Sequence, residues 1–219
     1  MAALIAFYSR AGENYFGGAY RRIAVGNTEK AAEMLADLTG GELYKIQQAQ
    51  PYSEDYQTCI AEAKANLQRK ARPEVRDLPE DLDVYDEIYL GYPNYWGTMP
   101  MAVYTFLEHY DLTGKTIHPF CTHEGSGLSR TVQDIQKAAP GAAVTKGLAL
   151  HGSSVDSARA ALEQWVREVE NEKRHALGQR RADRHGHRPP DGHGDEDRRG
   201  RQEDRKRAGR RQDHERGGL

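Results

Sequence analysis

Cysteine and long apolar segments are both scarce in this sequence. Cys59 and Cys121 are the only cysteines among 219 residues, and they are not spaced as a C-x-x-C pair. The first apolar run, residues 2–8, is far too short to span a bilayer, and no charged N-terminal region leads into a longer one. We therefore expect a soluble cytoplasmic chain with reduced thiols and no membrane partner.

Large apolar residues are missing from the end of the chain. After Val169 there is no Val, Ile, Phe, Tyr, Trp or Met. Residues 171–219 carry 15 Lys and Arg against 10 Asp and Glu, whereas residues 1–170 carry 16 against 23. We predict an acidic folded domain over residues 1–170 and a charged disordered tail over residues 171–219, because the tail has too little apolar surface to offset the entropy of ordering it.

The composition of the tail bears on two further hypotheses. Its charges are mixed and no aromatic residues are interleaved with them, which argues against a nucleic-acid partner. Residue usage changes abruptly after Trp165 and Val166, so the tail is also a candidate for out-of-frame sequence. Resequencing the coding DNA and measuring the intact mass would reject that origin if the frame is intact and the mass matches.

Two common nucleotide-binding motifs are absent. The sequence contains neither G-x-G-x-x-G nor a Walker lysine motif, which favours a mononucleotide over a dinucleotide or a nucleoside triphosphate. Phosphate could still bind where Asn27 and Thr28 begin a helix, near Ser9, because helix N-termini attract anions. The alternative is that Asn27 or Thr28 only caps the helix, a role worth about 1 kcal/mol.

Apolar strand-like runs alternate five times with amphipathic helical segments. Strands are predicted at residues 3–8, 42–46, 85–90, 116–121 and 143–150. Helices are predicted after Gly26, then at about 54–71, 101–109, 129–138 and 154–170. This alternation indicates an α/β fold in which a parallel sheet carries helices on both faces. Residues 13–25, which contain glycines and three aromatics, fit neither pattern and are expected to be irregular.

Three polar or aromatic loops follow predicted strands. They begin at Ser9, at Tyr92 and at Thr122. Ligands of open α/β sheets bind outside the carboxyl ends of the strands, so these loops describe one site. In the second loop, Pro93 is expected to end the strand and Tyr95 and Trp96 to present flat rings to a planar cofactor. Taken alone, that loop could equally fold its aromatics back onto the core.

The motifs in these loops resemble the flavodoxin-like proteins. They are SRAG at residues 9–12, the interruption GENYFGG, the resumption VGNTE, and the later GYPNYWGTMPM and FCTHEGSGL. The resemblance covers residues 1–166 and is nearest to a bacterial subgroup with an insertion in the phosphate-binding loop. It implies a three-layer fold, a five-stranded parallel sheet in the order 2-1-3-4-5, and bound flavin mononucleotide (FMN).

The resemblance also implies which residues contact the cofactor. The phosphate would be held by Ser9, Arg10, Asn27 and Thr28. The isoalloxazine would be lined by Pro93, Asn94, Tyr95, Trp96 and Gly97. The pyrimidine side would be closed by Thr122, His123, Glu124, Gly125 and Gly127. Trp96 is the first choice for the stacking ring, Glu13 and Asn14 are additional contributors, and no catalytic residue or metal ligand is predicted.

Three functions are compatible with these observations. The leading one is an FMN-binding electron-transfer protein of the flavodoxin type, whose acidic body docks onto basic redox partner proteins. The alternatives are an FMN-dependent oxidoreductase that passes hydride from NAD(P)H to a quinone, and a cofactor-free interaction domain. Within the insertion, Tyr15, Phe16 and Tyr20 would form either a lid over the phosphate or a cover for the sheet edge.

Overall fold

The structure is a computed structural model in which residues 2–186 are described, with side chains through residue 176. Contacts within the chain define a compact first unit over Met1–Leu177, and the described part of the second unit is residues 178–186. The central sheet and the candidate site lie in the first unit. Among the described residues, no helix is long and apolar enough to cross a membrane.

A parallel sheet forms the centre of the first unit. Its strands, in spatial order, are β10 (Leu148–His151), β8 (Thr116–His123), β7 (Tyr85–Pro93), β1 (Ala2–Phe7) and β4 (Glu42–Lys45), with β9 (Ala143–Val144) beside the start of β8. When β9 and β10 are counted as one interrupted strand, the order is 2-1-3-4-5. The predicted α/β fold class and strand order are confirmed.

The interruption of the fifth strand has a local cause in β8. The Thr145 N–H donates to the Ile117 carbonyl at 3.0 Å, so alternate residues of β8 from Ile117 onward face the fifth strand. The next residue on that side is Pro119, which has no N–H to donate. The chain opposite leaves the sheet and turns at Gly147, whose φ is +79°, before β10 resumes the pairing.

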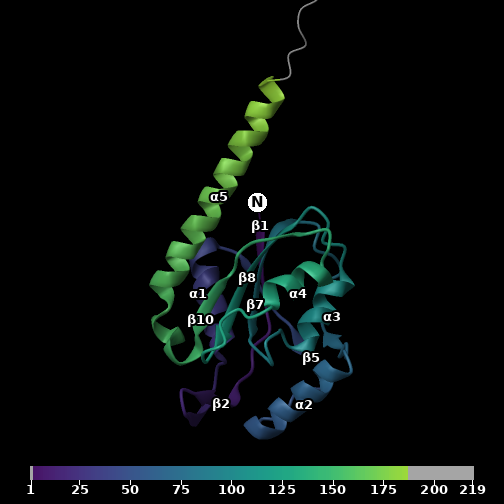
Figure 1. Cartoon of the computed structure of the whole chain (residues 1–219), viewed down its shortest axis with the longest axis vertical. Coiled ribbons are helices and arrows are strands. Elements are labelled where there is room, and N and C mark those ends of the chain that lie inside the picture. Colours follow the sequence, from purple (N-terminus) through teal and green to yellow (C-terminus); the bar gives the residue numbers. More distant parts are fainter. Residues whose placement is uncertain (1, 187–219) are drawn as a thin grey trace, which may run out of the picture. The chain divides into compact units, whose positions relative to one another are not determined.

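Helices cover both faces of the sheet (Figure 1). The helical elements are α1 (Asn27–Thr39), α2 (Tyr56–Gln68), α3 (Met101–His109), α4 (Thr131–Ala138), the 3₁₀ helix η1 (Gly152–Ser157) and α5 (Arg159–Gly186). One buried cluster joins the sheet to α1 and α5, and a second joins it to α3 and α4. These two clusters make the three layers that the sequence predicts.

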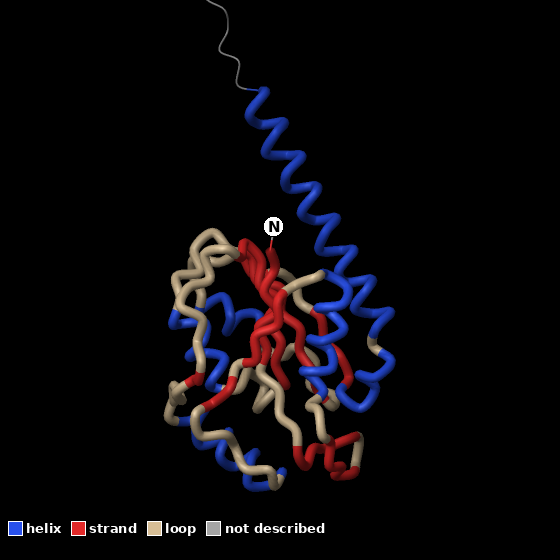
Figure 2. Tube along the Cα trace, turned by 180° about the vertical axis from the view of Figure 1, so that it is seen from behind, coloured by secondary structure: helices blue, strands red, loops and turns tan. Residues whose placement is uncertain are grey.

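The carboxyl ends of the strands meet at one edge of the sheet, where two further elements gather (Figure 2). One is α2, which begins there. The other is an antiparallel hairpin formed by β2 (Gly12–Phe16) and β3 (Ala19–Ile23). A second small pair, β5 (Gln47–Gln48) and β6 (Val75–Arg76), lies after β4.

The hairpin corrects the expectation that residues 13–25 are irregular. Gly17 and Gly18 form a two-residue turn with φ values of +50° and +111°. A turn with both central residues at positive φ matches the twist of an antiparallel pair, and two glycines adopt it without steric cost. The glycine pair, flanked by aromatic residues, is the signal for the hairpin in the sequence.

Strand β7 also runs further than predicted, because it continues through Pro93 rather than ending near Leu90. The Gly91 carbonyl accepts a hydrogen bond from Tyr8 N–H, so Gly91 faces β1. Pro93, two residues later, faces the same side of β7, but β1 has already ended at Phe7. The missing N–H of Pro93 therefore costs no ladder hydrogen bond. The longer strand carries the following loop directly to the edge of the sheet.

The last helix corrects a predicted boundary, because α5 continues to Gly186 rather than ending near Glu170. Part of the segment predicted to be disordered is therefore helical. Arg174 pairs with Glu170 one turn earlier, and Lys173 pairs with the buried Glu87 of β7, so charged residues support this part of the helix. Residues 187–219 of the predicted tail lie outside the described residues.

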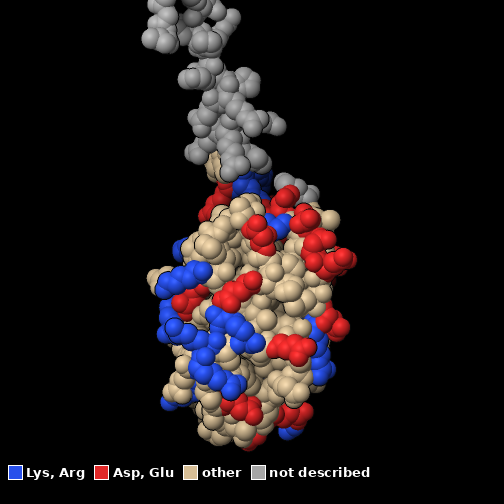
Figure 3. All heavy atoms as spheres, turned by 90° about the vertical axis from the view of Figure 1, so that its right-hand side faces the viewer, with Lys and Arg blue, Asp and Glu red and all other residues tan. Residues whose placement is uncertain are grey.

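Charged side chains of both signs cover the side of the molecule that carries α2 and α3 (Figure 3). Lys and Arg side chains are interspersed there with Asp and Glu, and neither sign forms a continuous surface. Arg72, in the segment that follows α2, pairs with Glu108 of α3, with Nε and Oε2 2.6 Å apart. This face therefore does not present the single-sign surface expected of electrostatic docking.

Candidate functional site

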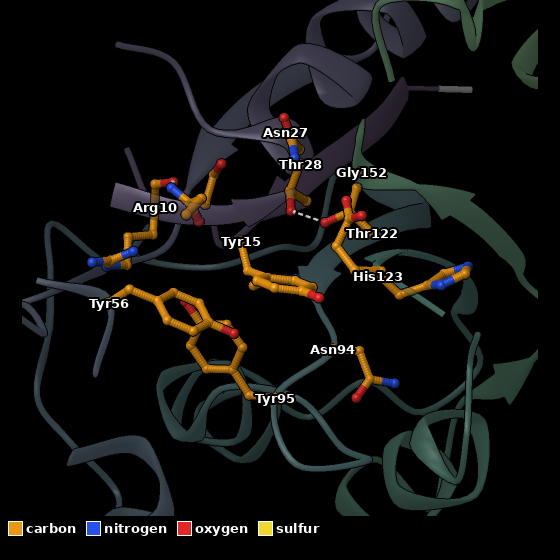
Figure 4. A pocket seen from close by; sticks show the side chains of 14 residues that line it. Arg10, Tyr15, Asn27, Thr28, Tyr56, Asn94, Tyr95, Thr122, His123 and Gly152 are labelled. Atoms are coloured by element: carbon orange, nitrogen blue, oxygen red, sulfur yellow. Dashed lines mark hydrogen bonds between the residues drawn. The ribbon is translucent and has the colours of Figure 1, made fainter. Parts of the chain in front are cut away.

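A cavity of about 130 Å³ opens at the carboxyl edge of the sheet (Figure 4). It is lined by Ser9, Arg10, Asn14, Tyr15, Asn27, Thr28, Tyr56, Pro93, Asn94, Tyr95, Thr122, His123, Glu124 and Gly152. The three loops that the sequence singled out thus converge on one site, together with the hairpin, the start of α2 and the start of η1. Ten of the fourteen predicted site residues, Arg10 among them, contribute to its lining.

The start of α1 forms the end of the cavity suited to an anion. A Cβ on Gly26 would lie 2.2 Å from Ser9 Oγ and 2.7 Å from the Arg10 carbonyl oxygen, so this close approach requires glycine. Ser9 Oγ accepts a hydrogen bond from the Glu29 N–H at 3.1 Å. The earlier N–H groups of the first turn have no partner within the helix and, together with the helix dipole, favour an anion.

Two threonines join this helix to the end of β8. The hydroxyls of Thr28 and Thr122 are 2.7 Å apart and form a hydrogen bond, and both residues are buried. One hydroxyl donates to the other, so the accepting hydroxyl keeps its proton and both oxygens keep lone pairs for hydrogen bonds to a ligand. The pair fixes the distance between the first and third loops of the site.

Asn27 and Glu124 place two buried acceptors beside these threonines. Asn27 Oδ1 and Glu124 Oε1 are buried without a hydrogen-bond partner within the described residues. Both side chains border Gly152, where a Cβ would lie 2.7 Å from Glu124 Oε1 and 2.8 Å from Asn27 Nδ2. Because an unpaired buried oxygen is costly, two such atoms at the edge of a cavity indicate a ligand that donates hydrogen bonds.

Arg10 lies at the cavity but its guanidinium points away from the start of α1 (Figure 4). It donates to the carbonyl oxygens of Ser53 at 2.8 and 3.1 Å, Glu54 at 2.6 Å and Glu13 at 2.5 Å. With its donors committed to these carbonyls, Arg10 ties the base of the hairpin to the segment before α2. The structure therefore does not place it as the phosphate ligand that the resemblance implies.

Tyr95 and Trp96 point in different directions. They belong to a tight turn in which Tyr95 and Thr98 exchange two backbone hydrogen bonds, with Trp96 and Gly97 at φ +56° and +78°. Tyr95 lines the cavity, and its partly buried ring packs edge-on against Tyr8 with ring centroids 6.3 Å apart. Desolvation at this position raises its hydroxyl pKa well above the ordinary value. Trp96 does not line the cavity.

Trp96 instead packs on α2. Its Nε1–H donates to the Ile60 carbonyl at 3.0 Å, and the Lys64 ammonium lies 4.9 Å from the centre of its ring. The side chain is 46% exposed. The left-handed backbone turns the Trp96 ring toward α2 rather than into the cavity, so the stacking role expected of Trp96 stays a prediction.

The glycines of the second and third loops also lie outside the lining. Gly97 N–H donates to Asn94 Oδ1 at 3.0 Å, and its carbonyl accepts from Arg130 N–H at 3.3 Å. Asn94 also donates to the Gly127 carbonyl at 2.9 Å, so it joins the two loops. Gly97, Gly125 and Gly127 shape the loops rather than the cavity wall, since each has positive φ.

Sequence reasoning missed two residues of the lining, Tyr56 and Gly152. Tyr56 is the first residue of α2, and its ring stacks against Tyr15 with centroids 6.2 Å apart. Gly152 begins η1. Their signals in the sequence are weak. Tyr56 falls inside a helix predicted to begin at about residue 54, and Gly152 comes two residues after the predicted end of a strand.

The histidine and cysteine beside the cavity are kept neutral. Burial and the neighbouring His151 ring lower the pKa of His123, and its Nδ1 accepts from Gly125 N–H at 2.9 Å, which leaves the proton on Nε2. Burial raises the pKa of the Cys121 thiol to about 12. A group that stays protonated at neutral pH is a poor nucleophile, so Cys121 behaves as a small core residue.

These features define a flavodoxin-like protein: an α/β sheet in the order 2-1-3-4-5, with an anion-binding helix start and a ligand cavity at its carboxyl edge. The chain belongs to the flavodoxin family, because a flavodoxin family model matches residues 18–169, more than half of its length. The match begins inside the hairpin, so membership of a subgroup with an insertion there stays a prediction. No curated protein matches the chain significantly.

Solved structures resemble the chain over most of its length. A candidate flavoprotein from Bacteroides uniformis is 29% identical, with 76% of this chain and 97% of that one covered, at a TM-score of 0.62. One from Bacteroides eggerthii is 28% identical over 74% and 97%, at a TM-score of 0.57. A Lactobacillus acidophilus flavoprotein in complex with FMN, 24% identical over 71% and 97% at a TM-score of 0.52, shares the fold.

Proposed function

We propose that this chain is an electron-transfer protein that holds one FMN non-covalently in the cavity and exchanges electrons with redox partner proteins. FMN is the cofactor supported by membership of the flavodoxin family and by an FMN complex among the structural neighbours. The observation that carries the proposal is the pair of unpartnered buried acceptors, Asn27 Oδ1 and Glu124 Oε1, beside an anion-binding helix start.

The donor and acceptor groups of the cavity match the parts of FMN. The free N–H groups at the start of α1 and the Ser9 hydroxyl suit a phosphate dianion without a cationic side chain. The ribityl chain carries hydroxyl donors, which the unpartnered oxygens of Asn27 and Glu124 require. Pro93 and Tyr95 provide an apolar wall for a planar ring.

Bound FMN supplies one- and two-electron redox chemistry, and the protein supplies binding, orientation and electrostatics. The buried threonine pair and the Glu124 carboxylate place the charge and dipoles around the cavity. A carboxylate at this depth disfavours added negative charge nearby, which would lower the potential for complete reduction. The neutral His123 adds no compensating positive charge.

Electron transfer is favoured over a hydride-accepting reductase by the shape of the site. The hairpin extends from the base of the cavity to Glu124 on its far side, where the Gly17 N–H donates to Glu124 Oε2 at 3.1 Å. A nicotinamide would have to reach the flavin past this segment, whereas single electrons can pass through an exposed edge. The acidic composition of residues 1–170 supports basic redox partners, although their docking face is not the mixed-charge side in Figure 3.

The test is an anaerobic dithionite titration of the full chain loaded with FMN, followed through its visible spectrum. We expect a one-electron-reduced form to accumulate, and NAD(P)H oxidation in the presence of a quinone to stay at the rate of free FMN. Direct two-electron reduction with rapid NAD(P)H turnover would replace this proposal with the reductase. A chain that does not bind FMN at all would leave the cofactor-free interaction domain.

A further inference from the structure

The hairpin crosses the cavity and is held at both ends. At its base, Glu13 N–H donates to the Glu54 carbonyl at 3.2 Å, and the Glu13 carboxylate accepts from Tyr56 N–H at 3.1 Å. At its tip, Gly17 N–H is bound by Glu124 from the opposite loop. The segment between these attachments therefore spans the opening from the α2 side to the β8 side.

Tyr15 and its neighbour Asn14 are the hairpin residues that line the cavity, and Tyr15 supplies an aromatic ring (Figure 4). Its ring lies between the threonine pair on one side and Tyr95 on the other in this view. Tyr20, its partner across the hairpin, has its ring centroid 6.0 Å away, and Tyr56 of α2 is 6.2 Å away in a stacked arrangement. These two rings pack against Tyr15, whose side chain is 37% exposed.

The cavity beneath Tyr15 is too small for the whole cofactor. Its volume of about 130 Å³ is well below the roughly 300–1,000 Å³ of typical small-molecule sites. The threonine pair, the start of α1 and the turn at Tyr95 are fixed by buried hydrogen bonds and core packing. No residue of the hairpin belongs to either core cluster, so it is the part that can make room.

We propose that the β2–β3 hairpin is a movable wall of the flavin site and that Tyr15 covers the isoalloxazine ring once FMN is bound. This inference rests on the proposed function and assigns to Tyr15 the contact that the sequence suggested for Trp96. Opening breaks the bond between Gly17 and Glu124 and swings the hairpin about its base. Closing restores that bond and places the Tyr15 ring over the bound cofactor.

The base of the hairpin has the properties of a hinge. Gly12 has a φ of +86°, and a Cβ there would lie 3.4 Å from the Glu54 carbonyl oxygen. The far strand of the hairpin, Ala19–Ile23, is exposed over nearly all of its length. Its Arg22 pairs with Glu54 on the surface, where ion pairs contribute little. Movement therefore uncovers little apolar surface apart from the contacts of the three tyrosines.

The test compares Tyr15→Ala with Tyr15→Phe and Trp96→Ala in the full chain, using FMN as the ligand. The readouts are the FMN dissociation constant, the FMN dissociation rate, and quenching of bound-flavin fluorescence by iodide. We expect Tyr15→Ala to raise the dissociation constant and rate about tenfold, since loss of an aromatic ring stacked on a planar base has effects of that order. Iodide should also gain access to the bound flavin.

The two comparison variants separate stacking from other effects. Tyr15→Phe keeps the ring and should stay within about twofold of the unmodified chain in all three readouts. Trp96→Ala removes an aromatic from the adjacent turn and should leave iodide access unchanged. Tyr15 lies on a hairpin outside both core clusters, so its variants should keep the fold. Circular dichroism of each variant before FMN is added checks this.

Each outcome decides between the two proposals. If the unmodified chain binds FMN but Tyr15→Ala changes neither affinity nor iodide access, the movable-wall inference is wrong and the proposed function stands. If Trp96→Ala exposes the flavin and Tyr15→Ala does not, the stacking ring is Trp96. If the unmodified chain binds no FMN, both proposals are rejected together.

Discussion

The turn at residues 95–98 and the hairpin at residues 12–23 both bring aromatic rings to the carboxyl edge of the sheet, but they differ in how firmly they are held. The turn is closed by two backbone hydrogen bonds and joined to the third loop through Asn94. The hairpin is attached at its base, by one hydrogen bond at its tip, and by one from Gln57 of α2 to the Tyr20 hydroxyl at 2.7 Å, and it lies outside both core clusters. One wall of the cavity is therefore fixed, and the other is able to move.

The aromatic residues in these two segments therefore have different positions relative to the cavity. Trp96 lies in the loop where a flavin-contacting ring is expected, yet its backbone turns it onto α2. Tyr15 lies in a segment that looked irregular, yet it enters the cavity. The fixed wall supplies polar groups and support, and the movable wall supplies the ring that covers the site.

The largest expected effect comes from disturbing the start of α1 at Gly26. Gly26→Ala would force the Ser9 hydroxyl and the Arg10 backbone apart, because the new Cβ lies 2.2 Å from Ser9 Oγ. We expect the free energy of unfolding to fall by about 1–3 kcal/mol and FMN affinity to fall at least tenfold, about 1.4 kcal/mol. Urea unfolding and fluorescence titration measure the two effects.

The matched control lies at the other end of the same helix. Gly40 has a φ of +68° with no atom within 4 Å of a new Cβ, so Gly40→Asn should be tolerated. It should leave FMN affinity unchanged. Equal losses of affinity in the two variants would show that α1 as a whole, rather than its packed N-terminus, controls binding.

Acid should destabilise the central sheet through His118 of β8. Burial lowers the pKa of His118 to about 4. Glu87 Oε2 lies 3.9 Å from the His118 ring, but Lys173 already pairs with that carboxylate. His118 becomes protonated near pH 6.5 in the unfolded chain, but only near pH 4 in the folded chain. The stability contributed by neutral His118 is thus complete above pH 6.5 and is lost as the pH falls toward 4, by about 3 kcal/mol.

The corresponding experiment is urea unfolding from pH 7 to pH 4. His118→Gln should flatten the decline in unfolding free energy, whereas the same change at the exposed His109 should not. The hairpin contains no histidine, so its amide exchange, corrected for intrinsic rates, should vary less with pH than that of β8. An unchanged decline in His118→Gln would assign the acid sensitivity to other groups.

A smaller effect is expected at Trp96, where the fixed wall meets α2. Trp96→Ala removes the hydrogen bond to the Ile60 carbonyl and the contact with Lys64, and should lower the unfolding free energy by about 1–2 kcal/mol. Trp96→Gly should be less destabilising, because glycine adopts the observed φ of +56° without strain. Thermal or urea unfolding compares the two. A glycine variant less stable than the alanine variant would contradict the role of the left-handed backbone.

The smallest effect is expected from stiffening the movable wall. Gly17→Asn fits a φ of +50° with open space around its Cβ, keeps the N–H bound by Glu124, and creates the Asn-Gly turn favoured in hairpins. It should stabilise the hairpin by about 0.5 kcal/mol and slow its amide exchange about twofold. Gly18→Asn is the control, because a φ of +111° suits glycine alone, and it should speed exchange. Faster exchange in Gly17→Asn would overturn this view of the turn.

The sequence was sufficient for the arrangement of the sheet and for the approximate location of the site. Strand and helix patterns predicted the alternation and the convergence of Ser9, Asn27 and Thr122, whereas the strand order was implied by the resemblance of the loop motifs to the flavodoxin-like proteins. These features depend on local pattern and on general rules of α/β topology. Strand and helix ends were less accurate, as Pro93 and the extension of α5 show, because they depend on which neighbouring strand or ion pair is present.

Side-chain directions within the site could not be predicted in the same way. Trp96 faces outward because of one backbone angle, and Arg10 is drawn to carbonyls of residues 53 and 54, more than forty positions away. Tyr15 reaches the cavity only because Gly17 and Gly18 fold the insertion into a hairpin. Each of these outcomes depends on tertiary contacts that leave no periodic signal in the sequence.

The most direct measurement is a fluorescence titration of FMN and of riboflavin, which lacks the phosphate, with the full unmodified chain. The account predicts that FMN binds at one site per chain, at least about tenfold more tightly than riboflavin, because the start of α1 and Ser9 hold the phosphate. Equal affinity for the two flavins, or no binding of either, would contradict it.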